Sequence, residues 1–311
     1  MKTAFLFSGQ GAQYTGMGKE LYANEKIVAE TFDQASEALG YDMASLCFDE
    51  DQVDKLNQTE YTQPAILTVS IAFWRLLSAK GFTADAVCGL SLGEYSALVA
   101  SGAIDFKTAV ALVAKRGHFM ANAAPAGSGK MVAVMNTQSE IIEQCCQKAS
   151  DIGIVSPANY NTPQQIVIGG EVAAVDKACE LLMEAGSKRL IPLNVSGPFH
   201  TALLKPAAEQ LAVELAKINF APMTVPVISN TTAQVMPQSE IKSLLEQQVM
   251  SPVHFYESVD TLKKLGITQM VEIGPGKVLS GFLKKIDKTI ATTRVEDSKT
   301  LNETIAFLAD E

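Results

Sequence analysis

One serine at the centre of the pentapeptide GLSLG has the clearest chemical potential in this sequence. The pentapeptide, residues 89–93, follows a short apolar run that predicts a buried strand and precedes a run that predicts a helix. A nucleophile elbow has this context, because glycines let the backbone turn sharply and present the Ser91 hydroxyl above the sheet edge. The N-terminus of the helix then favours developing negative charge. The alternative interpretation is an ordinary serine N-cap.

A serine hydroxyl needs a neighbouring base, and the sequence contains three histidines. His118 lies in a predicted helix, and His254 lies in the polar, turn-like segment SPVHFYES. His200 follows Gly197 and Pro198, which set a rigid turn before a new helix. By elimination we favour His200 as the base, and a structural role for the other two histidines.

A glycine-rich loop follows the first predicted strand in FLFSGQGAQYTGMG, residues 5–18. Such a loop could hold a phosphate at the start of a nucleotide-binding fold. The dinucleotide pattern G-x-G-x-x-G requires a third glycine at position 14, where this sequence has Tyr14. The dinucleotide interpretation therefore fails on its own pattern.

Charge and cysteine content exclude several classes of function. A net charge of -9 argues against nucleic-acid binding, which requires a basic face. The odd number of cysteines and the absence of a C-x-x-C pattern argue against a disulfide framework or a zinc site. The N-terminal apolar run is too short for a signal peptide, and no apolar run is long enough to span a membrane. We therefore expect a cytoplasmic protein with inert thiols at Cys47, Cys88, Cys145, Cys146 and Cys179.

The elements that must position the serine and histidine alternate along the chain. Hydrophobic patterns predict strands at 3–7, 86–88, 225–229 and 270–273. They predict helices at 25–39, 62–80, 92–100, 106–121, 207–218, 241–248 and 278–286. Strands that alternate with helices favour an α/β fold with a mainly parallel sheet covered on both faces.

A linker of small residues, NAAPAGSGK at 122–130, interrupts this pattern. The chain that follows has the order β-α-β-β-α-β, which is the order of a ferredoxin-like unit. We therefore predict a discontinuous catalytic domain formed by residues 1–125 and 197–311. Residues 126–196 would form an inserted ferredoxin-like subdomain.

Five motifs occur in the order of a known family: GQGAQYTGMG, GLSLGEYSAL, ALVAKRGHFM, VSGPFHT and VEIGPGKVLSG. The chain resembles the malonyl-CoA:acyl carrier protein transacylases of type II fatty acid synthesis over essentially its whole length. It is also similar to the acyltransferase domains of polyketide synthases. The resemblance implies an α/β-hydrolase-like core around the predicted parallel sheet.

The resemblance also implies roles for individual residues. Ser91 would be the nucleophile that forms a malonyl ester, and His200 the base that activates it. The backbone N–H groups of Gln10 and Leu92 would form an oxyanion hole, so the glycine loop would cradle an oxygen anion. A backbone carbonyl at Gln248 would orient the histidine in place of a carboxylate.

Two further positions would determine specificity. Arg116 matches the residue that pairs with the malonyl carboxylate, which suits a planar, bidentate guanidinium. Without the resemblance, a solvated charge on a helix would be the favoured interpretation. Phe199 matches the bulky residue that disfavours branching at the α-carbon, an effect limited to about 1–3 kcal/mol for one methyl group. Leu90 departs from the family, which commonly has histidine there.

The implied reaction is ping-pong transfer of malonyl from malonyl-CoA to the phosphopantetheine thiol of acyl carrier protein, without a metal or bound cofactor. The acidic carrier would dock on a local basic surface, at Lys188 and Arg189 or at Lys284 and Lys285. The alternatives are a trans-acting polyketide acyltransferase, a serine hydrolase of the α/β-hydrolase class, and a non-catalytic acyl-binding protein.

Overall fold

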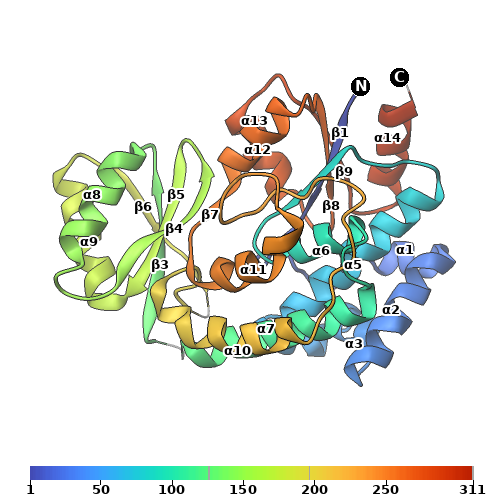
Figure 1. Ribbon diagram of the computed structural model, residues 1–311, viewed down its shortest axis with the longest axis horizontal. Coiled ribbons are helices and arrows are strands. Elements are labelled where there is room, and N and C mark those ends of the chain that lie inside the picture. The colour runs from blue at the N-terminus through green and yellow to red at the C-terminus, as the bar shows by residue number, and fades with distance from the viewer. Residues whose placement is uncertain (125–126, 196, 310–311) are drawn as a thin grey trace.

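A computed structural model describes residues 1–124, 127–195 and 197–309, and it contains two separate sheets (Figure 1). The first sheet has the strand order β2-β1-β8-β9, and all of its neighbouring strands are parallel. Its strands are β1 (Thr3–Phe7), β2 (Ala86–Gly89), β8 (Gln269–Ile273) and β9 (Ala291–Val295). Every residue of β1 and β8 is buried, as expected for strands covered on both faces. The predicted α/β class with a parallel sheet is confirmed.

Helices surround the first sheet. They are α1 (Lys19–Asn24), α2 (Lys26–Leu39), α3 (Met43–Phe48), α4 (Val53–Leu56), α5 (Thr59–Ala79), α6 (Gly93–Ala100), α7 (Phe106–Ala123), α10 (Lys205–Ala216), α11 (Ile241–Met250), α12 (Phe255–Lys264), α13 (Val278–Ile286) and α14 (Ser298–Ala309). The long helix α5 is buried along most of its length, because apolar or small residues occupy nearly all of its faces. Within the described ranges, no helix has the length and apolar character needed to cross a bilayer.

The second sheet has the order β6-β3-β5-β4-β7 and lies beside the first part of the molecule (Figure 1). Its elements are β3 (Gly129–Met135), α8 (Ser139–Ala149), β4 (Val155–Thr162), β5 (Gln165–Glu171), α9 (Val172–Glu184), β6 (Arg189–Pro192) and β7 (Val253–His254). The predicted order β-α-β-β-α-β is present from β3 to β6. The fifth strand, β7, comes from outside the segment 126–196. The predicted domain boundaries fall at residues 125–126 and 196, which lie outside the described residues.

Alternation along β3 gives the second sheet two different faces. Val132 and Val134 belong to the core that α8 and α9 complete. Met131 and Ala133 belong instead to the core shared with the first part of the molecule. Because successive side chains of a strand point to opposite faces, one face of this sheet packs on its helices and the other faces the first sheet's elements.

Several predictions about single elements were wrong. The predicted strand at 225–229 forms only isolated bridges, Val87 with Val227 and Ile228 with Val235. The segment SPVHFYES is not a turn, because it contains β7 and the start of α12. Strand β9 and helix α14 were not predicted. Residues 225–229 are an almost continuous apolar run, whereas polar residues interrupt the apolar pattern in SPVHFYES, β9 and α14, so periodicity alone did not separate strand, helix and loop.

Candidate active site

Ser91 lies on a sharp turn between β2 and α6. Its backbone is left-handed, with φ of 52°, which is a strained conformation for a residue with a side chain. The flanking glycines make this turn possible. A Cβ on Gly89 would lie 1.9 Å from the carbonyl carbon of Gly93, and a Cβ on Gly93 would lie 2.2 Å from the Phe7 carbonyl oxygen. The predicted strand–turn–helix context is therefore present, with the backbone packed too closely for any larger residue.

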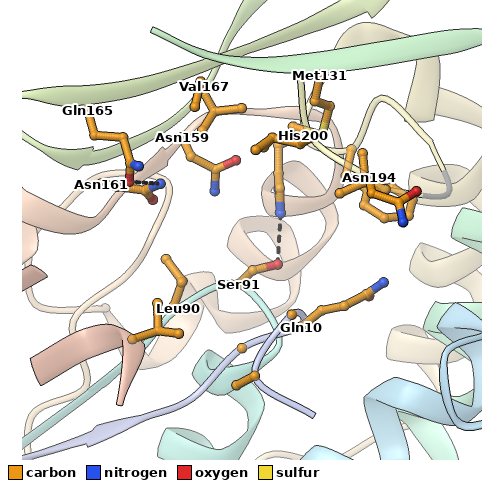
Figure 2. Close-up of a pocket in the computed structure, with 18 of the residues that line it drawn as sticks. Gln10, Leu90, Ser91, Met131, Asn159, Asn161, Gln165, Val167, Asn194 and His200 are labelled. Carbon is orange, nitrogen blue, oxygen red and sulfur yellow. Dashed lines mark hydrogen bonds between the residues drawn. The ribbon is translucent and has the colours of Figure 1, made fainter. Parts of the chain in front are cut away.

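His200 lies directly beside the serine, although 109 positions separate the two residues. Ser91 Oγ is 2.7 Å from His200 Nε2, as Figure 2 shows. On the other side of the ring, Nδ1 is 2.7 Å from the backbone oxygen of Gln248. A carbonyl can only accept, so Nδ1 carries the proton and Nε2 is left free to accept the serine proton.

The histidine is held as a neutral base. It is 4% exposed. Burial, and then the nearby Arg116 guanidinium, lower the pKa of the imidazole to about 4. Its backbone is also left-handed, with φ of 59°. Two strained residues that face each other are typical of a functional site rather than of a fold-stabilising contact.

Arg116 is buried beneath the serine, with 1% of its surface exposed. Nη1 donates to Gln63 Oε1 at 2.7 Å, and Nη2 donates to Gln248 Oε1 at 2.8 Å and to Ser91 Oγ at 3.2 Å. The guanidinium also lies 5.3 Å from the centre of the Tyr95 ring. The alternative of a solvated helix charge is therefore wrong. A buried cation without a carboxylate among these partners is suited to receiving an anionic ligand.

Close packing of α7 on α5 gives Arg116 its partner Gln63. A Cβ on Gly117 would lie 2.6 Å from the Thr59 carbonyl oxygen and 2.8 Å from Glu60 Cα. Only glycine permits this approach. The residue after the arginine therefore sets the distance between the two helices at the site.

Two backbone N–H groups flank the serine. Neither Gln10 nor Leu92 donates its N–H to another described residue. The Gln10 side chain is tied to α5 by a bond from Nε2 to Thr59 Oγ1 of 3.1 Å. A pair of unpaired donors at this turn could stabilise an oxyanion formed on a group attached to Ser91.

A cavity of about 870 Å³ lies over Ser91, between the elements of the two sheets (Figure 2). We call its lower side, formed by Gln10, Leu90 and Ser91, the floor. We call its upper side, which the second sheet forms, the roof; its residues are Met131, Ala133, Asn159, Asn161, Gln165 and Val167. Phe199 also lines the cavity, next to His200. Leu90 gives the floor an apolar surface.

The other two histidines lie in different environments. His118 contacts Glu60 and Asn122. His254 contacts Glu257 and stacks on the Tyr160 ring at a centroid distance of 4.8 Å. Neither lines the cavity.

Sequence reasoning missed three polar residues of the site. Asn230 Oδ1 accepts the Ser91 N–H at 2.6 Å, Gln63 holds the arginine, and Glu94 lies buried behind the turn. No spacing signature marks the two amides. Glu94 gave a usable signal, because it is the single charged residue in the otherwise apolar helix GEYSALVA.

Comparisons with known proteins give one consistent result. The model of the acyl transferase domain family matches residues 4–301. The malonyl CoA-acyl carrier protein transacylase of Bacillus subtilis is 47% identical over 312 residues, which cover 100% of this chain and 98% of that protein. The crystal structure of MCAT from Streptococcus pneumoniae is 61% identical with a TM-score of 0.96, and all of both chains is covered. A malonyl-transacylase in complex with a type II PKS acyl-carrier protein is 40% identical with a TM-score of 0.95, covering 99% of this chain and 100% of that one.

Proposed function

The chain belongs to the acyl transferase domain family, and from that premise we propose that it transfers malonyl from malonyl-CoA to the phosphopantetheine thiol of an acyl carrier protein. The observation that carries this proposal is the arginine buried at the nucleophile. Its Nη2 is 3.2 Å from Ser91 Oγ, so the carboxylate of a malonyl group esterified to that oxygen lies within reach of the guanidinium. This reaction supplies malonyl groups for fatty acid synthesis.

The proposed mechanism is ping-pong. His200 Nε2 takes the proton from Ser91 Oγ, which attacks the thioester carbonyl of malonyl-CoA. The N–H groups of Gln10 and Leu92 stabilise the oxyanion, and one such donor is worth roughly 3–4 kcal/mol. The CoA thiolate leaves with the proton from His200. The carrier thiol then attacks the ester by the same steps in reverse.

The partner of Nδ1 argues for transfer rather than for a hydrolase triad. In α/β-hydrolases a carboxylate accepts the Nδ1 proton of the base, whereas here the Gln248 carbonyl accepts it. A neutral acceptor stabilises the imidazolium less, which agrees with the low pKa of His200.

Substrate preference is assigned to two residues. Arg116 would favour malonyl over acetyl, because acetyl leaves the buried cation without a carboxylate. Phe199 would disfavour methylmalonyl by narrowing the cavity beside the base. One methyl group changes binding by about 1–3 kcal/mol, so this is a preference rather than an exclusion.

The carrier would approach the cavity over exposed basic residues. Lys284 and Lys285 lie on α13, which also lines the cavity through Val278 and Phe282. Lys188 and Arg189 lie at β6, just before the cavity-lining residues 193–195. Either pair suits an acidic carrier.

We also propose the finer description of the fold. The strand order β6-β3-β5-β4 and its antiparallel pairing support a ferredoxin-like subdomain, inserted into a core of α/β-hydrolase type. The domain limits 126–196 and a cytoplasmic location stay predictions.

The test is the intact mass of the protein after brief mixing with malonyl-CoA. We expect a malonyl adduct on the wild type, no adduct on Ser91→Ala, and acetyl transfer from acetyl-CoA by Arg116→Ala. Free malonate and CoA without an adduct would indicate a hydrolase. No adduct and no CoA release would overturn the proposed substrate.

A further inference from the structure

A buried carboxylate behind the nucleophile takes no part in the mechanism above. Glu94 lies in the first turn of α6, three positions after Ser91, and its surface is 0% exposed. Its Oε2 accepts the Asn230 N–H and Gln248 Nε2, each at 2.9 Å. Its Oε1 has no hydrogen-bond partner among the described residues. A half-satisfied buried carboxylate costs free energy, so local stability does not explain it.

The first group that Glu94 holds is Asn230, which in turn holds the nucleophile turn. Asn230 Oδ1 accepts the Ser91 N–H at 2.6 Å, and its Nδ2 donates to the Gly89 oxygen at 2.7 Å. These bonds fix both sides of a turn whose backbone is strained at the serine. The Glu94 carboxylate therefore anchors the residue that keeps the strained turn in place.

The second group is the side-chain amide of Gln248. Its Nε2 donates to Glu94 Oε2 and to the backbone oxygen of Ser91, at 2.9 Å each. Its Oε1 accepts from Arg116. When it is ionised, the Glu94 carboxylate can only accept, so it turns the NH₂ side of this amide toward itself. The oxygen then has to face the guanidinium. Without the carboxylate, a flipped amide would place NH₂ against the cation.

We propose that Glu94 is a positioning residue for acyl transfer, which orients the Gln248 amide, holds the nucleophile turn through Asn230, and balances the Arg116 charge until a malonyl carboxylate replaces it. This inference rests on the proposed function. It assigns the malonyl preference to the arginine together with a carboxylate one amide away.

The charge on Glu94 is variable near neutrality. Burial raises the pKa of its carboxyl to about 7, against the lowering effects of its bonds from Asn230 and Gln248 and of Arg116. The other titratable groups that face it are Cys88 on β2 and Tyr95 on its own helix, and burial raises both pKa values to about 12. Neither of these groups changes charge near pH 7.

A direction follows for the pH dependence. As pH rises through about 7, Glu94 becomes anionic and repels a second carboxylate at Arg116. The preference for malonyl-CoA over acetyl-CoA should therefore fall with rising pH. The CoA portion is common to both substrates, so its own titration cancels in the ratio.

The experiment measures the rate of Ser91 acylation by malonyl-CoA and by acetyl-CoA, by intact mass, at pH 6 and pH 8. In the wild type we expect the malonyl-to-acetyl ratio to fall at least about fivefold between these values. In Glu94→Gln we expect a ratio that does not depend on pH, and acylation about 10-fold slower at pH 7. Glu94→Asp keeps the charge on a shorter side chain. Acylation should therefore be slower, while the malonyl-to-acetyl ratio should still fall with rising pH.

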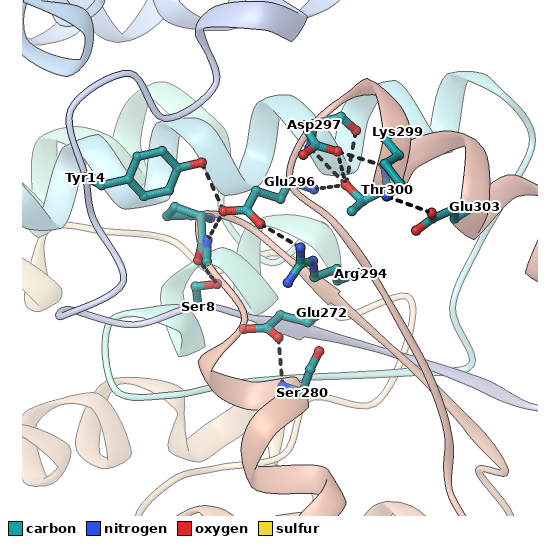
Figure 3. Close-up of polar contacts among 12 residues, drawn as sticks. Ser8, Tyr14, Glu272, Ser280, Arg294, Glu296, Asp297, Lys299, Thr300 and Glu303 are labelled. Atoms are coloured by element: carbon teal, nitrogen blue, oxygen red, sulfur yellow. Dashed lines mark hydrogen bonds and ion pairs between the residues drawn. The ribbon is translucent and has the colours of Figure 1, made fainter.

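Glu272→Gln is the matched control. Glu272 is also a fully buried carboxylate, but it accepts the Leu279 and Ser280 N–H groups at the start of α13 (Figure 3). The Glu272→Gln variant should keep the wild-type pH dependence of the malonyl-to-acetyl ratio. The role of Glu94 is overturned if the wild type shows no pH dependence of the malonyl-to-acetyl ratio. It is also overturned if Glu94→Gln keeps that pH dependence or if Glu94→Asp loses it. A wild type that forms no malonyl adduct overturns the proposed function instead.

Discussion

The floor and the roof of the cavity are built in different ways. On the floor, Ser91 is held through its N–H, its backbone oxygen and its hydroxyl, and every group behind it is buried. On the roof, Asn161 Oδ1 is buried without a hydrogen-bond partner among the described residues, and Asn161 Nδ2 donates to Gln165 Oε1 at 3.2 Å. The groups that hold Ser91 on the floor are thus bonded to one another, whereas the roof has a buried amide oxygen that accepts no hydrogen bond from a described residue.

This difference separates chemistry from recognition. Proton transfer requires groups fixed to fractions of an ångström, which explains the dense bonding of the floor. A thioester arm that enters and leaves twice per cycle needs contacts that are easily exchanged, which explains the sparse bonding of the roof. Substitutions on the floor should therefore change rate constants, and substitutions on the roof should change KM.

The largest effect should come from removing the base. His200→Ala leaves Ser91 Oγ without a proton acceptor, so we expect malonyl transfer to fall by about 10³- to 10⁴-fold. Stopped-flow measurement of CoA release checks this. A loss of less than about tenfold would show that another group takes the proton.

The next largest effect should come from changing the shape of the cation beneath Ser91, the Arg116 guanidinium. Arg116→Lys keeps the charge but cannot contact Gln63, Gln248 and a malonyl carboxylate together. We expect the malonyl-to-acetyl preference to fall about 100-fold, with the acetyl rate little changed. If lysine preserves the preference, charge alone selects malonyl and the fork geometry is unimportant.

The three central residues of the site differ in how far sequence alone could predict them. Ser91 was predicted from local pattern, because the glycines and the strand–turn–helix order are contiguous. His200 was found by elimination among three histidines. The burial of Arg116 was not predictable from residues, since KRG on a helix is equally typical of a solvated face.

The contacts of the Asn230 and Gln248 groups with Glu94 could not be predicted from sequence, for a physical reason. Asn230 and Gln248 meet Glu94 only after α11 and the loop after Val227 fold against α6, and no periodicity encodes that meeting. The same limit explains the missed β9 and the wrong strand at 225–229. Whether each of these segments forms a strand depends on its pairing with other segments of the chain.

A smaller effect on the acylation rate should come from lowering the pH until His200 is protonated. The pKa of His200 is lowered to about 4, so the imidazole stays an unprotonated proton acceptor at higher pH. The enzyme should lose activity as pH falls through about 4, because the base is then protonated. At saturating malonyl-CoA we expect the acylation rate at pH 3 to be about tenfold lower than at pH 5. Circular dichroism at each pH checks that the fold persists. A midpoint near 6.5 would mean that the imidazole is not desolvated in the working enzyme.

The smallest effect should come from the roof. Asn161→Ala removes an amide side chain that lines the cavity and donates to the neighbouring roof residue Gln165 (Figure 2). We expect KM for malonyl-CoA and for the carrier to rise about two- to tenfold, as for one neutral hydrogen bond, with kcat unchanged. Asn24→Ala, at an exposed amide on α1, is the control. A fall in kcat for Asn161→Ala would break the comparison, because the roof would then share in the chemistry that the floor performs.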